Sequence, residues 1–142
     1  NQYAKLGERG NFAGKLSLGI ATNNMSPFSP FVLDGILNVR GIGNRVERGT
    51  AEFIGNIEYR NSFISRDVFS IQGAVFADYG TTRMPGTKLS SLFKRDQHYL
   101  FTGIGIRLHL KKWFKTCLRV DYSVNPLNTN QQGFTFGFGQ FF

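Results

Sequence analysis

The sequence has no apolar run that approaches the roughly 18–20 residues required by a transmembrane helix. It has a single cysteine, Cys117, which excludes an internal disulfide. Acidic residues are few, with 9 Asp and Glu against 17 Lys and Arg, so the net charge is +8. These cations are spread along the chain, mostly at turns or singly, which argues against a nucleic-acid-binding surface. We expect their partner to be the anionic surface of an outer membrane or acidic groups elsewhere in a larger barrel, and not nucleic acid.

Signals of an enzyme are also missing. The sequence contains no Gly-x-Ser-x-Gly nucleophile motif and no phosphate-binding loop. His98 and His109 have no Cys or His neighbours at the spacing of metal ligands. We therefore expect no catalytic residues, no metal and no cofactor in this chain.

Phenylalanine and glycine are abundant. Aromatic residues make up 15% of the 142 residues, with 15 Phe, yet the mean hydropathy is only -0.21. This combination indicates that apolar and polar residues are interleaved, as they are in membrane β-barrels. The 17 glycines suit strands that twist and pack closely.

Residues 51–60 show this interleaving most clearly. One set of alternate positions is apolar or small: Ala51, Phe53, Gly55, Ile57 and Tyr59. The other set is mostly polar: Glu52, Asn56, Glu58 and Arg60. A period of two with this separation predicts a strand between an apolar and a polar environment.

Similar patterns predict further strands along the chain. We expect six strands, at about 11–22, 50–61, 68–79, 99–110, 115–124 and 133–142, after the end of an earlier strand at 1–6. Short and long connections alternate, with long loops at about 23–50, 81–97 and 125–132. This alternation, with strands of about ten residues, is typical of outer-membrane barrels. Aromatic residues near strand ends would form interfacial girdles: Tyr59, Tyr79, Trp113, Phe114 and Phe142.

Alternation alone does not separate a membrane barrel from a soluble antiparallel barrel or sandwich. The polar side favours the membrane barrel, because its charges suit an aqueous lumen: Lys15, Glu52, Glu58, Asp78, Arg107, Arg119 and Asp121. We therefore predict an all-β protein, a transmembrane antiparallel β-barrel. We place it in the bacterial outer membrane, in contact with outer-membrane lipids and lipopolysaccharide.

The first long loop, at about 23–50, is apolar and glycine-rich and carries Arg40 near its centre. We predict that it enters the lumen, where Arg40 pairs with Glu58 and Asp78 on adjacent strands and locks the loop in place. Val39 and Gly41 flank Arg40 and belong to the same predicted lock. The alternative is that Arg40 is one of many lumen charges that contact water.

Six short motifs follow one another along the chain. They are Phe31-x-Leu33-x-Gly35, Val39-Arg40-Gly41-Ile42, Ile57-Glu58-Tyr59-Arg60, Phe76-x-Asp78-x-Gly80, Gly103-x-Gly105-x-Arg107 and Arg119-x-Asp121-Tyr122. With these motifs, and a last strand rich in Phe, the chain resembles the BamA/TamA superfamily of outer-membrane assembly and translocation barrels, the bacterial surface antigen family. Ile42 and Gln140 depart from its pattern, which has an aromatic and an apolar residue at these positions.

The resemblance covers nearly the whole chain as the last six strands of that family, and it implies a sixteen-stranded barrel. Six strands cannot close a barrel, and open edges do not survive in lipid. We therefore expect residues 1–142 to be the C-terminal portion of a longer barrel, or to pair with another chain that carries the remaining strands. The last strand, ending at Phe142, would carry the C-terminal signal, and Gly137 and Gly139 would weaken it as a lateral gate.

Two functions are compatible with this resemblance. The first is assisting the insertion or translocation of outer-membrane proteins, with unfolded outer-membrane proteins or assembly-complex subunits as partners. The second is anchoring or exporting a fused patatin-like phospholipase or phosphoesterase domain. The residues that precede Asn1 would separate these two. A passive pore fits poorly, because the apolar loop should plug the lumen.

Overall fold

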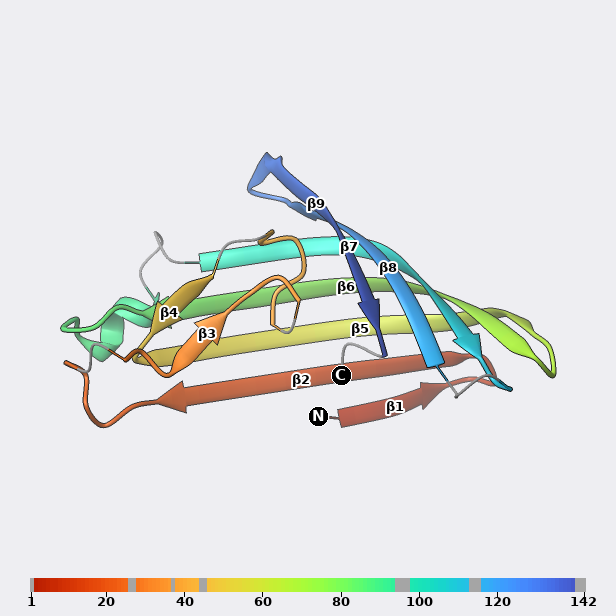
Figure 1. Cartoon of the computed structure of the whole chain (residues 1–142), viewed down its shortest axis with the longest axis horizontal. Coiled ribbons are helices and arrows are strands. Elements are labelled where there is room, and N and C mark those ends of the chain that lie inside the picture. Colours follow the sequence, from red (N-terminus) through yellow and green to blue (C-terminus); the bar gives the residue numbers. More distant parts are fainter. Residues whose placement is uncertain are drawn as a thin grey trace.

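A computed structural model describes residues 2–25, 28–36, 38–43, 46–93, 98–112 and 116–139. Its main element is an antiparallel sheet of seven strands, in the order β1-β2-β5-β6-β7-β8-β9 (Figure 1). The strands are β1 (Gln2–Leu6), β2 (Gly10–Ile20), β5 (Ala51–Ser65), β6 (Phe69–Arg83), β7 (His98–Leu110), β8 (Thr116–Asn125) and β9 (Asn128–Phe138). A small sheet of β3 (Phe31–Leu33) and β4 (Glu47–Gly49) lies in the connection between β2 and β5.

The predicted all-β, antiparallel fold class is confirmed. Each predicted strand corresponds to one strand of the main sheet, and the predicted stub at the start of the chain is β1. Within the described residues the sheet remains open, with β1 and β9 at its two edges. The total of sixteen strands stays a prediction.

The predicted long loop at 125–132 is wrong. β8 and β9 are joined by a tight turn at Pro126 and Leu127, and β9 already begins at Asn128. The Asn- and Gln-rich run is therefore part of a hairpin, with a register shift between Val124 and Asn125. Strand pairing is made by backbone hydrogen bonds, and polar side chains weaken a strand without preventing these bonds.

The C-terminal end of β9 also differs from the prediction. The strand ends at Phe138, and Gly139 follows it with a φ of 82°. Phe142, together with the predicted girdle residues Trp113 and Phe114, lies outside the described residues.

The two faces of the main sheet reverse the pattern of a water-soluble sheet, in which apolar side chains are buried and charged side chains are exposed. One face exposes large apolar side chains, among them Leu16, Leu18, Ile57, Val75, Ile104, Ile106, Phe134, Phe136 and Phe138. The other face buries charged side chains, among them Glu58, Asp78, Arg107, Arg119 and Asp121. A continuous exposed apolar face requires an apolar surrounding such as lipid. This arrangement favours the membrane barrel over the soluble alternative.

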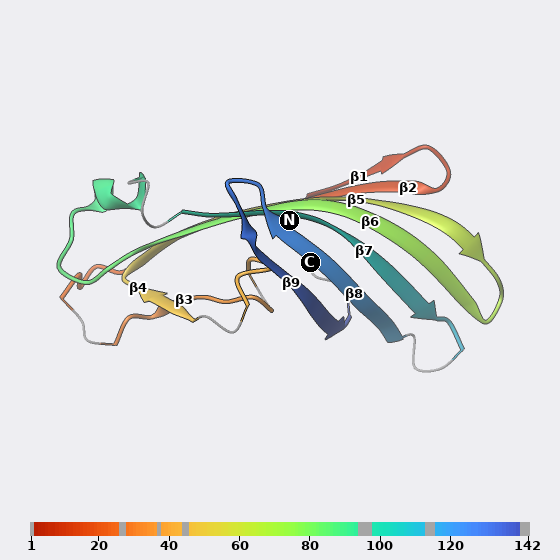
Figure 2. The same ribbon diagram turned by 90° about the horizontal axis from the view of Figure 1, so that it is seen from above.

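The long connection from β2 to β5 covers the polar face. β3 and β4 lie beneath the sheet in Figure 2, while the short 3-10 helix η1 (Leu89–Phe93) lies on the opposite side. Thr81 of β6 fastens this helix by donating a hydrogen bond from Oγ1 to the Leu92 carbonyl, at 2.9 Å. The described residues include no helix with the length and apolar character needed to cross a bilayer.

The exposure pattern of β9 can be tested by spin labelling of the full-length protein in a bilayer. With Cys117 replaced by serine, we expect a label on Phe136→Cys to collide readily with oxygen dissolved in the lipid, because Phe136 is 69% exposed on the apolar face. A label on the neighbouring Thr135→Cys is the matched control and should collide much less. Equal oxygen accessibility at the two positions would contradict the assignment of faces.

Candidate functional site

Arg40 is presented by a tight loop on the polar face of the sheet. The Val39 amide donates to the Asp34 carbonyl at 2.9 Å, which closes the loop, and Gly41 follows Arg40 with a φ of 96°. A side chain at Gly41 would also meet Ser123, since a Cβ there would lie 2.3 Å from the Ser123 Oγ atom. Glycine is thus required by both the backbone conformation and the close approach to β8.

The guanidinium of Arg40 is fully buried and forms a fork with Asp78 of β6. Its Nε atom donates to Asp78 Oδ2 at 2.7 Å, and its Nη2 atom donates to Asp78 Oδ1 at 2.9 Å. The backbone amide of Arg40 donates to the same carboxylate, at 3.1 Å. Its Nη1 atom donates to Glu58 of β5. The pair of hydrogen bonds from Arg40 Nε and Nη2 to the two oxygens of Asp78 is the geometry that a planar guanidinium suits best.

The carboxylates that hold Arg40 are themselves shared with other arginines. Arg60 donates from Nε to Glu58 at 2.5 Å, and Arg107 of β7 donates from Nη2 to both Glu58 oxygens, at 3.2 and 3.3 Å. Arg107 also pairs with Asp121 of β8 through Nη1. We call this set the ion-pair cluster: Arg40, Glu58, Asp78, Arg60, Arg107 and Asp121.

The ion-pair cluster is balanced, with three guanidinium groups facing three carboxylates. Burying a single charge is costly, and removal of one partner of a buried pair typically costs about 3–5 kcal/mol. Burial alone would lower the pKa of Arg40, but the hydrogen bonds and charges of Asp78 and Glu58 outweigh it and raise that pKa above its usual value. Arg40 therefore remains charged.

Three further residues support Arg40 or the loop that carries it, and the prediction of the lock did not include them. The Phe76 ring lies under its guanidinium, with 3.5 Å between Cζ and the ring centroid, a cation–π contact. Asn56 donates from Nδ2 to the Asn38 carbonyl at 2.7 Å and to Asp78 at 2.9 Å. Phe76 and Asn56 lie two residues from Asp78 and Glu58 on the same strands, so they point to the same face. The two-residue alternation of the sequence could therefore have identified them.

The third supporting residue is Arg119 of β8. It donates from Nη2 to the Ile36 carbonyl of the loop at 3.1 Å. A Cβ at Gly137 of β9 would lie 2.4 Å from its Nε atom. Arg119 thus contacts the loop on one side and the last described strand on the other.

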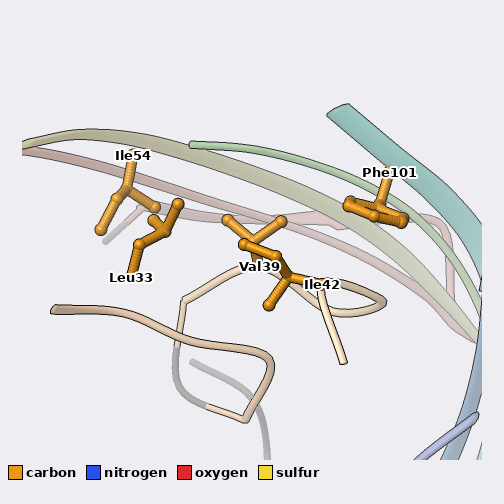
Figure 3. Close-up of a cluster of buried hydrophobic side chains, with 5 residues drawn as sticks. All are labelled: Leu33, Val39, Ile42, Ile54 and Phe101. Carbon is orange, nitrogen blue, oxygen red and sulfur yellow. The ribbon is translucent and has the colours of Figure 1, made fainter. Parts of the chain in front are cut away.

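Apolar packing completes the docking of the loop. Figure 3 shows the buried hydrophobic cluster of Leu33, Val39, Ile42, Ile54 and Phe101. The first three come from the loop, while the other two come from β5 and β7. Ile42 is buried, so a branched aliphatic side chain fills the position where the resemblance led us to expect an aromatic ring.

The predicted site residues fall into two groups. Val39, Arg40, Gly41, Glu58 and Asp78 come together as described. Gly137 lies outside the ion-pair cluster against Arg119, and Gly139 follows β9 and donates its amide to the Cys117 carbonyl at 2.7 Å. Among the residues that the structure describes, no group of three or more His, Cys, Asp or Glu side chains is placed to hold a metal ion.

Removal of the fork should release the loop. In the full-length protein in membranes, we expect Arg40→Ala to expose residues 31–43 to protease, because Asp78 and Glu58 would lose their shared cation at a cost of about 3–5 kcal/mol. Arg48→Ala is the matched control, since Arg48 is an exposed arginine on β4 in the same connection. The measurement is the rate of cleavage within the loop. Unchanged cleavage in Arg40→Ala would rule out the predicted lock.

A methyl group at Gly80 of β6 should displace the loop by overpacking. A Cβ there would lie 2.6 Å from both the Leu33 Cδ1 and the Val39 Cγ2 atoms, so we expect a cost of about 1–3 kcal/mol. Hydrogen exchange of the amides of residues 31–43 should therefore become faster in Gly80→Ala. Gly55→Ala is the control, because its Cβ would meet only Leu16, at 3.7 Å. Similar protection in the two variants would argue against this packing.

Of three comparisons with known proteins, one gives a match, and it agrees with the membrane-barrel architecture. No curated protein and no solved structure matches the chain significantly. A family model described as the Omp85 superfamily domain matches residues 1–142. Domains of this superfamily are β-barrels of bacterial outer membranes that act in transport and assembly and are not enzymes. The family model matches residues 1–142, and the sheet has the apolar outer face of a membrane barrel. The chain therefore belongs to the Omp85 superfamily.

Proposed function

We propose that this chain is the C-terminal portion of an outer-membrane barrel that assists the insertion or translocation of other outer-membrane proteins. The observation that carries the proposal is the way the loop is fastened. The ion-pair cluster takes Arg40 from the loop and one carboxylate or guanidinium partner from each of four successive strands: Glu58, Asp78, Arg107 and Asp121. Strands β5 to β8 and the loop are thereby held as one unit.

A fastened loop supports an assembly role better than a passive pore. The loop covers the polar face with an apolar cluster and a buried guanidinium, so it would obstruct a water-filled path along that face. Residues 23–50 would thus form a plug that enters the lumen, and strands outside this chain would complete the wall. A substrate protein would then need another route, along the wall of the barrel.

The edge at β9 offers such a route. β9 pairs with β8 on one side, and its other edge has no partner among the described strands. Its inward positions are small, at Gly133, Thr135 and Gly137, so little packing holds it from within. An exposed strand edge recruits an incoming strand through backbone hydrogen bonds. An unfolded outer-membrane protein, or a subunit of an assembly complex, is the partner that fits this edge.

The contact between Arg119, the loop and Gly137 would connect the plug to this edge. Because Arg119 donates to Ile36 and packs on Gly137, displacement of the loop would free Arg119 to move against β9. We assign Gly137, Gly139 and Phe142 to the gate and C-terminal signal on this basis and on the resemblance of the last strand. Lipopolysaccharide would contact the end of the sheet that carries the long connections.

The proposal can be tested by reconstitution. Liposomes that contain the full-length protein should fold an urea-denatured outer-membrane barrel faster than liposomes that contain a passive porin. The measurement is the fraction of client that becomes protease-resistant and heat-modifiable with time. Arg40→Ala should reduce this rate, whereas Arg48→Ala should not. Equal rates in both kinds of liposome would contradict the proposal and favour a barrel that only anchors a fused phospholipase or phosphoesterase domain.

A further inference from the structure

A pocket lies at the end of the sheet where the strands are joined by short turns. The β5–β6 hairpin extends past the β1–β2 turn at this end (Figure 1). A hydrogen bond from the Ser62 amide to the Arg9 carbonyl, at 3.0 Å, joins the two. Beyond it, a pocket of about 320 Å³ is lined by Arg9, Ser62, Phe63, Ile64, Ser65 and Arg66.

The polar side of this pocket suits a phosphate group. Arg9 and Arg66 approach it from two different turns, and no ion pair joins either of them to a carboxylate in the described part of the chain, although Glu8 and Asp67 are their neighbours in sequence. Lys111 adds a third cation, since its Nζ atom donates to Ser65 Oγ at 2.9 Å. Guanidinium groups and hydroxyls are the groups that bind phosphate oxygens best.

The other side of the pocket is apolar and faces outward. The register shift between Ser62 and Ile64 leaves Phe63 as the extra residue of a bulge, and Phe63 and Ile64 are exposed by 66% and 44%. Phe63 packs on the outer face, because a Cβ at Gly73 would lie 2.4 Å from its ring. The bulge thus places two apolar side chains beside two arginines.

A separate apolar groove lies on the outer wall, nearer the middle of β5. It has a volume of about 350 Å³ and is lined on the outer face by Phe12, Ile57, Tyr59, Val75, Ala77 and Thr102. Tyr59 and Phe63 are four residues apart on β5, a separation of about 14 Å in a strand. An acyl chain that starts near Phe63 would therefore reach the groove.

We propose that this pocket and groove bind one anionic glycerophospholipid, such as phosphatidylglycerol, from the periplasmic leaflet. Its phosphate lies between Arg9 and Arg66, and an acyl chain lies in the groove beside Tyr59 and Ala77. Charge complementarity selects a phosphate ester, and the apolar groove about 14 Å further along the same strand selects a lipid over a soluble phosphate. Short turns of outer-membrane barrels face the periplasm, which determines the leaflet. The inference rests on the membrane placement of the chain and does not depend on the proposed insertion activity.

The test measures lipid binding to the full-length protein in detergent, without any client protein. After delipidation, native mass spectrometry gives the dissociation constants for phosphatidylglycerol and for phosphatidylcholine. We expect tighter binding of phosphatidylglycerol, and about 25-fold weaker binding of it by the double variant Arg9→Gln/Arg66→Gln, since each basic residue near an anionic lipid contributes about fivefold. Equal affinity for the two lipids would overturn the proposal.

Controls separate the pocket from general electrostatics. Arg48→Gln/Lys88→Gln removes the same charge at the opposite end and should leave the affinity for phosphatidylglycerol unchanged. Arg9→Lys/Arg66→Lys keeps the charge and should retain most of that affinity, which would show that the two positions tolerate replacement. A similar loss in the control at the opposite end would overturn the proposal.

The groove is tested separately. Ala77→Phe should fill it and weaken phosphatidylglycerol binding, and glycerophosphoglycerol, which has no acyl chains, should not compete. Effective competition by this free headgroup would show a soluble phosphate site and contradict the lipid. Full affinity in Ala77→Phe would equally contradict the groove.

Discussion

A buried guanidinium determines much of this structure. Arg40 has no exposed surface, so its charge must be met by protein acceptors, and Asp78 and Glu58 supply them. Two buried carboxylates then require further cations, which Arg60 and Arg107 provide, and Arg107 in turn draws in Asp121 of β8. The charges compensate one another across the four strands from β5 to β8. The cluster therefore requires one register across β5 to β8, because a slip of one residue would turn these side chains to the lipid face.

The loop has the role that a hydrophobic core has in a soluble protein. The sheet exposes most of its large apolar side chains, so these cannot form an interior for this chain. Leu33, Val39 and Ile42 of the loop instead pack against Ile54 and Phe101 on the polar face. Apolar contacts and the ion-pair cluster thus act on the same segment, the first by excluding water and the second by selecting one docked position. Exclusion of water also strengthens each charge interaction within the cluster.

Much of the fold and part of the site followed from local patterns. Alternation placed Glu58 and Asp78 on the inward face of neighbouring strands, and the loop motif singled out Arg40. Composition was a poor guide to the last hairpin, because residues 128–132 are polar yet form part of β9. Gly139 was assigned to a strand by the same pattern but adopts a φ of 82° after it. The conformation of a turn depends on where the hydrogen bonding between strands ends. Alternation of apolar and polar residues does not predict that position.

The order of side chains is enough to specify strands, faces and the sign of the charge on each face, since these follow from a two-residue repeat. It does not specify which charges meet across the sheet. The contacts of Arg107 with both Glu58 and Asp121, and of Arg119 with both Ile36 and Gly137, join residues that are distant in the chain. The contact of Arg119 with Ile36 in particular requires the curved sheet to bring β8 around to the docked loop (Figure 2). Curvature is a property of the assembled strands, and no single stretch of sequence encodes it.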